Sequence, residues 1–297
     1  NPPLKPTRQD FNLSQQTLNT PMTKTSLLLL LSYLVITSAF SQNEKHLLIK
    51  GKVRSETEQL MYVTLGIVNE NIGTISGQTG YFELKIPNRL INKKLTVSHV
   101  GYETGHFRLD SLTQLDAVDI SLRESAVELE DVVITADGLK PITKTYGIVR
   151  KYDSFAWIQD GDAGSEIVTL IQPKEEIFLE YVAVNVYNMD KQEFTLLLNL
   201  YSRDEDTGLP SGQLLKKQMI INSNKKKGWL EVNLKEQQLL LAEPFFVGFQ
   251  WTNMDDPVPM VGVKPGKSDE SLLRTQAFGE WQQQYIWNIK AVGFEYK

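Results

Sequence analysis

Residues Gly80–Pro87 read GYFELKIP and residues Leu95–Glu103 read LTVSHVGYE, and these two stretches decide the fold of the first part of the chain. Apolar and polar side chains alternate along both of them, and a period of two residues indicates strands with one buried face. Together with neighbouring runs of the same type they predict about seven strands within roughly 75 residues, a small antiparallel β-sandwich. The neighbouring runs are Ile49–Val53, Met61–Ile67, Glu103–Leu109 and Ala117–Leu122.

Glycines mark the turns that we expect between these strands. Gly73-Thr74 and the segment from Gly77 to Gly80 stand where a hairpin has to reverse its direction. A side chain there would obstruct positive φ angles, which glycine adopts freely. Both positions are therefore predicted to be turns.

The same motifs resemble the carboxypeptidase-like regulatory domain. They are GxV at Gly51–Val53, GT at Gly73-Thr74, GYFxLxIP from Gly80, and LxVSxxGYE from Leu95. The resemblance covers about a quarter of the chain and implies a transthyretin-like β-sandwich. Domains of this family occur behind metallocarboxypeptidase catalytic domains and at the N-termini of many TonB-dependent outer-membrane receptors.

Composition and charge narrow the class of protein. The chain has 297 residues, of which 41% are hydrophobic and 23% charged, as in an ordinary globular protein of roughly two domains. The formal net charge of −5 gives no indication of nucleic-acid binding, and the one basic run, Lys225–Lys227, is predicted to be a solvated hairpin tip. The sequence contains no cysteine, so neither a disulfide nor a lipoprotein anchor at a cleavage site is expected.

The N-terminal part carries the pattern of a secretory signal peptide. An apolar stretch begins at Leu27–Leu31, Lys24 precedes it, and Ala39-Phe40-Ser41 follows it. A basic flank, a short apolar core and small residues before a cleavage site are typical of such peptides, and the core is too short to span a membrane comfortably. We expect cleavage before Gln42 and an exported chain without a transmembrane segment, located in the periplasm, at the outer membrane or outside the cell.

The chain is accordingly predicted to be all-β, a transthyretin-like sandwich followed by a second, jelly-roll-like sandwich. The predicted segments are residues 1–21 as an upstream extension that is not translated, 22–41 as the signal peptide, 42–124 as the regulatory-type domain, 125–146 as an acidic, valine-rich linker strand, and 147–297 as the second sandwich.

The linker segment includes the string LEDVVITA at Leu129–Ala136. It resembles the segment that follows this domain in TonB-dependent receptors, but the roughly 150 residues that remain are too few for a 22-stranded barrel. Two interpretations stay open: an edge strand with an interdomain linker, or a strand from Glu128 to Ala136 that is offered to the sheet edge of a partner.

The second domain shows further alternating runs that are separated by turn residues. The order LPSGQLL, GWLEVNL and FFVGFQW resembles extracellular jelly-roll modules, including carbohydrate-binding ones, which is an analogy of fold. The predicted strands are Glu166–Ile171, Ile177–Tyr187, Glu193–Tyr201, Leu214–Ile221, Gly228–Leu234, Pro244–Trp251 and Gln284–Tyr296.

No catalytic motif is found in the sequence. A zinc peptidase needs two histidines and a carboxylate, but the three histidines form no HxxE or HExxH motif, and His99 and His106 are expected on a sheet surface. A GxSxG motif is absent, and GVKPGK at Gly262–Lys267 lacks the spacing of a phosphate loop and is predicted to be a plain loop. We therefore expect neither an enzyme nor a metal or other cofactor.

Two kinds of residue remain as candidates for binding. Asp204–Asp206 and Asp255-Asp256 are acidic loops that are either solvated or hold a structural calcium ion. Tryptophans stack on sugar rings and are enriched at recognition surfaces. Alternation puts Trp251 in the core, whereas Trp229 and Trp281 lie in polar surroundings and are expected to be more exposed than Trp251, with a half-buried position as the alternative. The candidate ligand-binding residues are Trp229, Trp281, Asp255 and Asp256.

Three functions are compatible with this pattern. The first is a non-catalytic envelope protein that binds or scaffolds a protein or a glycan. The second is an accessory of TonB-dependent uptake at the outer membrane, acting through the Glu128–Ala136 strand. The third is a glycoside or ester hydrolase in the second sandwich, which would need two carboxylates facing each other across a cleft. The sequence gives no indication of the oligomeric state.

Overall fold

A computed structural model describes residues 45–125, 140–148, 154–158, 163–189, 192–253 and 259–297. Strands make up 56% and helices 4% of the structure, and several sheets form sandwich-like layers, which confirms the predicted all-β fold. The segments predicted as upstream extension and signal peptide, and the Glu128–Ala136 strand, lie outside the described residues. No helix in the described part of the chain has the length and apolar character that crossing a membrane requires.

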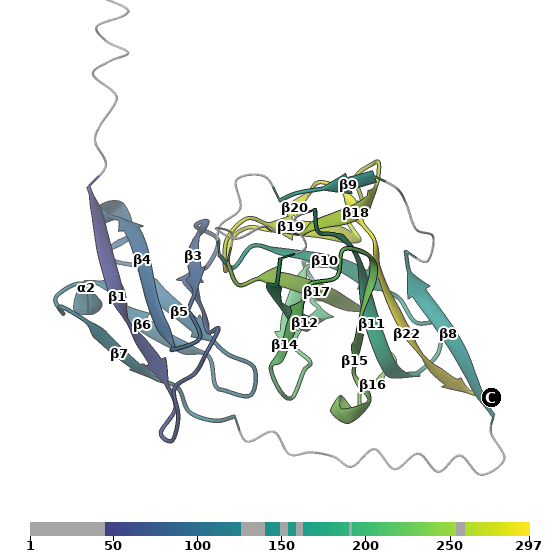
Figure 1. Ribbon diagram of the computed structural model, residues 1–297. Coiled ribbons are helices and arrows are strands. Elements are labelled where there is room, and N and C mark those ends of the chain that lie inside the picture. The colour runs from purple at the N-terminus through teal and green to yellow at the C-terminus, as the bar shows by residue number, and fades with distance from the viewer. Residues whose placement is uncertain (1–44, 126–139, 149–153, 159–162, 190–191, 254–258) are drawn as a thin grey trace, which may run out of the picture. The chain divides into compact units, whose positions relative to one another are not determined.

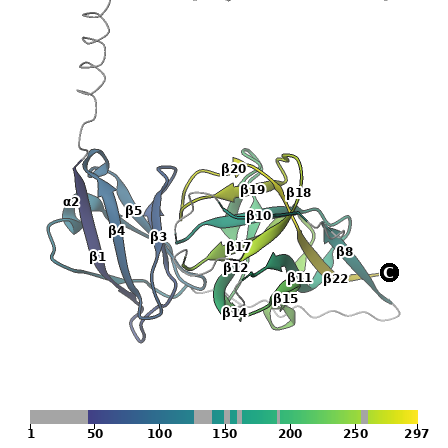
Figure 2. The same ribbon diagram turned by 45° about the horizontal axis from the view of Figure 1, so that its top comes forward.

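The first region, up to Ser125, contains seven strands, as predicted, and two short helices. They are β1 (His46–Arg54), β2 (Thr64–Ile67), β3 (Ile72–Ile75), β4 (Tyr81–Pro87), the 3-10 helix η1 (Asn88–Leu90), β5 (Lys94–Ser98), β6 (Gly105–Arg108), α2 (Leu109–Leu112) and β7 (Val118–Ser121). One sheet has the order β4-β1-β7 and the other the order β3-β2-β5-β6 (Figure 1). Strands β1 and β4 run antiparallel, side by side (Figure 2).

The predicted alternation is confirmed in β4. Phe82, Leu84 and Ile86 are buried in the core of this region, whereas the side chains between them are exposed. The prediction of a turn at Gly73-Thr74 is wrong, because both residues lie inside β3. The hairpin between β2 and β3 turns earlier, where Asn69 and Asn71 adopt φ angles of 61° and 49°. Asparagine tolerates this left-handed conformation better than most residues, so the turn requires no glycine.

The second region contains two large sheets. Its elements are β8 (Pro141–Gly147), β9 (Ser154–Ala156), β10 (Glu166–Ile171), β11 (Ile177–Tyr187), β12 (Phe194–Arg203), β13 (Pro210–Gln213), β14 (Met219–Ser223), β15 (Lys227–Asn233), η2 (Lys235–Gln237), β16 (Leu240–Leu241), β17 (Phe245–Trp251), β18 (Met260–Lys264), β19 (Ser271–Arg274), β20 (Gln282–Gln283), β21 (Ile286–Trp287) and β22 (Ile289–Tyr296).

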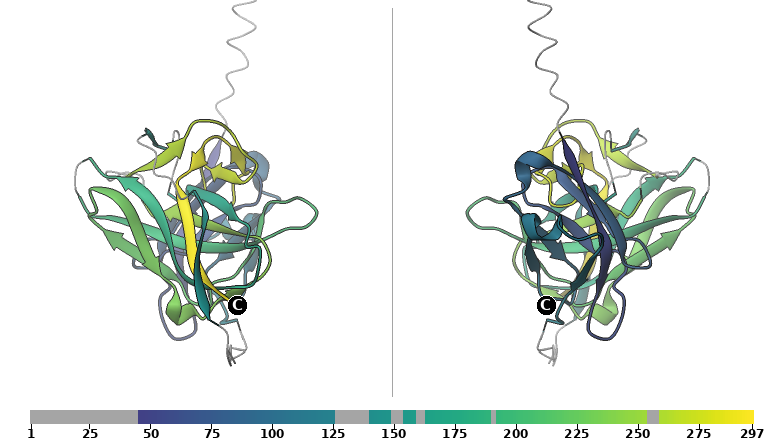
Figure 3. Two further views of the ribbon diagram at one scale, coloured as in Figure 1. Left: turned by 90° about the vertical axis from the view of Figure 1, so that its right-hand side faces the viewer. Right: turned by 90° about the vertical axis from the view of Figure 1, so that its left-hand side faces the viewer.

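The seven-stranded sheet has the order β13-β12-β17-β10-β19-β20, with β14 also paired to β12. The eight-stranded sheet has the order β21-β18-β11-β22-β8, with β15 and β16 on β11 and β9 on β18. Strand β22, yellow in Figure 3, joins β8 to β11, so the end of the segment predicted as a linker belongs to this sheet. One apolar core fills the space between the two sheets.

Several details of the second region differ from the sequence prediction. The predicted strand Leu214–Ile221 is wrong over its first five residues, because β13 ends at Gln213 and β14 begins only at Met219. The segment Gly262–Lys267 is not entirely a loop, since its first three residues belong to β18, which pairs with β9, β11 and β21. Strand β19 has no counterpart among the predicted strands. Its four residues are all buried and its neighbours are polar, so it has no alternation that a sequence could display.

Candidate functional site

A cavity of about 540 Å³ lies against the seven-stranded sheet, on the face that points away from the core between the two large sheets. Its lining comes from two parts of the chain. The first region contributes Thr64, Val68, Asn69, Ser98, His99, Val100, Gly101, Tyr102, Thr104 and Ser125. The second region contributes Leu197, Asn199, Tyr201, Asp204, Thr207, Leu209, Pro210, Ser211, Gly212, Gln213, Leu215, Gln218, Gln250, Arg274, Phe278, Gly279 and Trp281.

Strand pairing gathers polar side chains at the floor of the cavity. Glu166, at the start of β10, pairs in register with Gln250 on β17 and with Arg274 on β19. Side chains of directly paired residues point to the same face of a sheet, so these three lie together. Gly248 makes room for them, because a Cβ atom at this position would lie 2.6 Å from the Glu166 Oε1 atom.

The centre of the floor is a buried ion pair. The Glu166 side chain has no solvent exposure, and the Arg274 guanidinium donates to its Oε2 atom. The Tyr201 hydroxyl lies 3.1 and 3.2 Å from the two carboxylate oxygens, and Asn199 Nδ2 donates to Oε1 over 2.8 Å. The carboxylate is therefore hydrogen-bonded on both oxygens, as a buried charge requires.

The ionisation of the groups around this pair is fixed by their surroundings. Burial, reinforced by the Glu166 charge, raises the pKa of Tyr201 well above its ordinary value. Burial by itself lowers the pKa of Arg274, but the attraction of the Glu166 carboxylate outweighs it, and the resulting pKa is raised. At neutral pH the floor thus holds a neutral phenol and a charged guanidinium beside its counter-charge.

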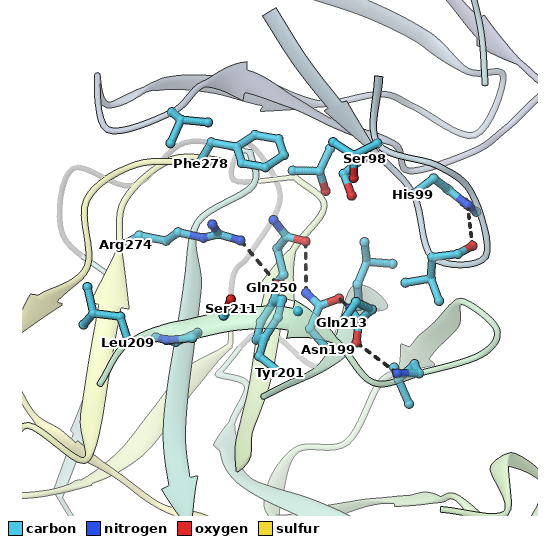
Figure 4. Close-up of a pocket in the computed structure, with 18 of the residues that line it drawn as sticks. Ser98, His99, Asn199, Tyr201, Leu209, Ser211, Gln213, Gln250, Arg274 and Phe278 are labelled. Atoms are coloured by element: carbon cyan, nitrogen blue, oxygen red, sulfur yellow. Dashed lines mark hydrogen bonds between the residues drawn. The ribbon is translucent and has the colours of Figure 1, made fainter. Parts of the chain in front are cut away.

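A chain of amides continues from this pair across the floor (Figure 4). Asn199 donates to Gln250 over 3.3 Å, Gln250 donates to the Gly164 carbonyl over 3.1 Å, and Gln213 Nε2 donates to Asn199 over 3.0 Å. The Gln213 oxygen accepts from the backbone amides of Leu200, Leu214 and Leu215. The acceptor oxygen of every one of these three amide side chains is thereby occupied within the protein.

Aromatic side chains and residues of the first region form the walls. The Arg274 guanidinium carbon lies 4.6 Å from the ring centroid of Trp281 and 6.0 Å from that of Phe278, which are cation–π distances. Figure 4 shows Ser98, His99 and Phe278 across the cavity from Asn199 and Tyr201. The cavity therefore has a polar floor, an aromatic wall and a wall from the other sandwich.

The hairpin β2–β3 is fastened to the loop that carries Phe278. The amide of Asn69 donates to the Phe278 carbonyl over 3.0 Å, and the amide of Gly73 donates to Gln276 Oε1 over 3.2 Å. A Cβ atom at Gly73 would lie 2.0 Å from the Ala277 carbonyl oxygen, so only glycine permits this approach. These contacts fix the two walls of the cavity relative to each other.

Of the residues predicted to bind ligand, the two tryptophans are not brought together. Trp281 lines the cavity, whereas Trp229 lies on β15 of the eight-stranded sheet, with the Lys290 amine 4.7 Å from its ring centroid. Both tryptophans are half-buried, which agrees with the alternative to full exposure. Asp255 and Asp256 lie outside the described residues. The placement of Trp251 in the core is confirmed.

The histidines and the acidic loop have ordinary roles. His106 is exposed on β6, as predicted, whereas His99 is half-buried, its Nδ1–H donates to the Val100 carbonyl, and burial lowers its pKa. Asp204 accepts hydrogen bonds from the amide and the hydroxyl of Thr207, which lower the pKa of its carboxyl. Within the described residues, no group of three or more histidine, aspartate or glutamate side chains is placed to hold a metal ion. The calcium alternative stays a prediction.

The sequence prediction did not identify the polar residues at the floor of the cavity. Glu166, Asn199, Gln250 and Arg274 are polar residues inside strands whose other residues are apolar, for example LLLNLY around Asn199. A polar side chain at a buried strand position needs a hydrogen-bond partner, and this requirement could have indicated a polar cluster from the sequence. The pairing itself joins residues from four strands far apart in the sequence.

Comparisons with known proteins place part of the chain in a family. Residues 49–134 match the family model of the CarboxypepD_reg-like domain. No curated protein matches the chain. Two capsid structures of infectious bursal disease virus, a T13 particle and the Gt strain, align at 12% identity over 84% of this chain, with TM-scores of 0.24 and 0.21. The chain spans 58% and 59% of those two chains, and a likeness this weak supports no conclusion about fold or function.

Proposed function

Residues 49–134 match the CarboxypepD_reg-like domain, and from this premise we propose that the chain is a non-catalytic binding protein of the cell envelope, with a glycan or a protein as its ligand. The observation that carries the proposal is the cavity of about 540 Å³ on the seven-stranded sheet. Its volume lies within the range of small-molecule sites, and it combines aromatic surface with a few polar groups, as such sites do. The family's domain supplies one of its walls.

The groups in the cavity favour binding over catalysis. The Glu166 carboxylate is buried and saturated by three donors, so it has no free oxygen to act as a base. Asp204 is the one carboxylate in the described lining, and the hydrolase alternative needs two that face each other. A surface that recognises a ligand needs only shape and hydrogen-bonding groups, and these are present.

The envelope location is proposed from the sequence. A basic residue, an apolar core and small residues before Gln42 favour export through a signal peptide. An association with TonB-dependent uptake would involve the Glu128–Ala136 strand, which lies outside the described residues, and it stays a prediction.

The test presents the purified chain to a glycan array and to a solubilised envelope fraction. Leu209, at the rim of the cavity, and Leu115, away from it, are both exposed and provide matched variants. We expect wild type and Leu115→Asp to bind the same array spot or envelope component, and Leu209→Asp to lose it. No specific binding on either support would contradict the proposed function.

A further inference from the structure

The cavity shows which chemical class of ligand it accepts. Resting on the function proposed above, we propose that its ligand is an uncharged, hydroxyl-rich molecule, a short neutral glycan, that contacts both sandwiches at once. Charge, free hydrogen-bonding groups and apolar surface in the lining all lead to this class.

The charges in the described lining provide no free positive charge for an anionic ligand. Arg274 is already neutralised by Glu166 beneath it. The Asp204 carboxylate accepts from the neutral groups of Thr207 and stays negative, so it repels an anion. Burial lowers the pKa of His99, which disfavours the protonated ring. An anionic ligand would have to shed its hydration without gaining a partner, which is unfavourable.

Free polar groups lie on the walls instead. The side chains of Thr64 and Ser98 in the first region, and of Ser211 and Gln218 in the second, line the cavity. None of these four side chains makes a hydrogen bond to another described residue. Hydroxyl and amide groups both donate and accept, so they match the hydroxyls of a sugar, which also do both.

Apolar surface completes the match. Trp281, Phe278 and Tyr102 line the cavity, and Val68 and Leu209 add exposed aliphatic side chains at its rim. Sugar rings carry apolar C–H faces that pack on aromatic rings, while their edges carry hydroxyls. A volume of about 540 Å³ accommodates a short oligosaccharide and excludes a folded protein domain.

The site is shared between the two sandwiches. Ser98 is the last residue of β5 in the first region, and Ser211 lies on β13 of the second. Figure 4 shows the two serines on opposite sides of the cavity. A ligand that bonds to both is held by both sandwiches, so each serine is expected to contribute to affinity.

The experiment uses the full exported chain and an array that pairs each neutral oligosaccharide with its sulfated or sialylated counterpart. The best neutral glycan is then titrated by calorimetry into wild type, Ser98→Ala, Ser211→Ala and the control Ser121→Ala, whose serine is exposed on β7 away from the cavity. We expect neutral members of the pairs to bind, and each cavity variant to lose about five- to tenfold in affinity, the loss typical of one hydrogen bond. Ser121→Ala should match wild type.

The outcomes separate this inference from the proposed function. If only acidic glycans bind, the neutral-glycan class is overturned and the binding function stays intact. The same holds if only an envelope protein binds and Leu209→Asp abolishes that binding. Neutral-glycan binding that neither serine variant weakens would overturn the assignment to this cavity. No binding to glycan or protein would overturn both.

Discussion

Glu166 and Arg274 are 108 residues apart in the sequence and form a buried ion pair at the floor of the cavity. Neither side chain is more than 10% exposed, and Tyr201 and Asn199 supply further donors to the carboxylate. A pair of this kind fixes which strands lie next to each other, because each charge is costly without the other. The floor of the cavity and the order of the seven-stranded sheet therefore depend on the same two residues.

The first prediction concerns this pair. Arg274→Met leaves the Glu166 charge buried without its partner and should lower the free energy of unfolding by about 3–5 kcal/mol. The matched control is Arg54→Met, which removes an ion pair with Asp119 whose two side chains are 47% and 61% exposed, and it should cost less than about 1 kcal/mol. Urea unfolding followed by tryptophan fluorescence measures both. Equal effects of the two variants would show that the buried pair has no special role.

The second prediction concerns the contact between β3 and the loop at Ala277. Gly73→Ala forces a Cβ atom against the Ala277 carbonyl oxygen and should destabilise the protein by about 1–3 kcal/mol, as overpacking does. At Gly77 the nearest atom to a new Cβ is 3.8 Å away, so Gly77→Ala should stay within about 0.5 kcal/mol of wild type. Thermal unfolding compares the two. A tolerated Gly73→Ala would mean that this contact does not hold the cavity walls together.

The third prediction concerns alkaline pH. Burial, together with a hydrogen bond to Glu295, raises the pKa of Tyr146 to about 12, from an ordinary value of 10. The folded state thus keeps a proton that the unfolded state releases above pH 10. The stabilisation is complete below pH 10 and is lost as the pH rises toward 12. Absorbance at the tyrosinate band should show at least two groups fewer, Tyr146 and Tyr201, titrating near pH 10 than in the unfolded chain. Tyr146→Phe should remove the part of this difference that Tyr146 makes. Titration of Tyr146 near pH 10 would contradict the prediction.

The fourth prediction concerns export. The full chain, expressed in a bacterium with an outer membrane, should appear outside the cytoplasm with Gln42 as its first residue. Intact-mass measurement of the exported protein reads the cleavage site directly. Ala39→Tyr places a large residue at the −3 position and should block processing, whereas Asn43→Tyr beyond the site should not. Full-length protein that stays in the cytoplasm would contradict the signal-peptide assignment.

Much of the fold could be predicted from the sequence, because alternation is a local property. The bounds of β10 and β11 agree with the predicted Glu166–Ile171 and Ile177–Tyr187. The turn at Asn69 and Asn71 was missed because Gly73 was interpreted as the turn residue. Glycine is needed at position 73 for another reason, the close approach of Ala277 from a distant part of the chain. Alternation says nothing about such contacts between regions.

The site was less accessible to sequence reasoning. Trp281, one of the predicted ligand-binding residues, lines the cavity, but Trp229 was selected on the same grounds and lies on another sheet. Exposure of a tryptophan does not say which surface it belongs to. The pairing of Glu166 with Arg274 depends on sheet order, which links strands that have no common local pattern.

The most direct test of the cavity as the binding site is to fill it. Ser211→Trp places an indole in the cavity from the exposed strand β13, and Ser121→Trp places the same side chain on β7, outside the cavity. The measurement is the affinity of both variants for the best-binding array glycan, by calorimetry. We predict that Ser211→Trp abolishes binding while Ser121→Trp keeps the wild-type affinity and both unfold at the same temperature. Unchanged binding by a folded Ser211→Trp variant would contradict the assignment of function to this cavity.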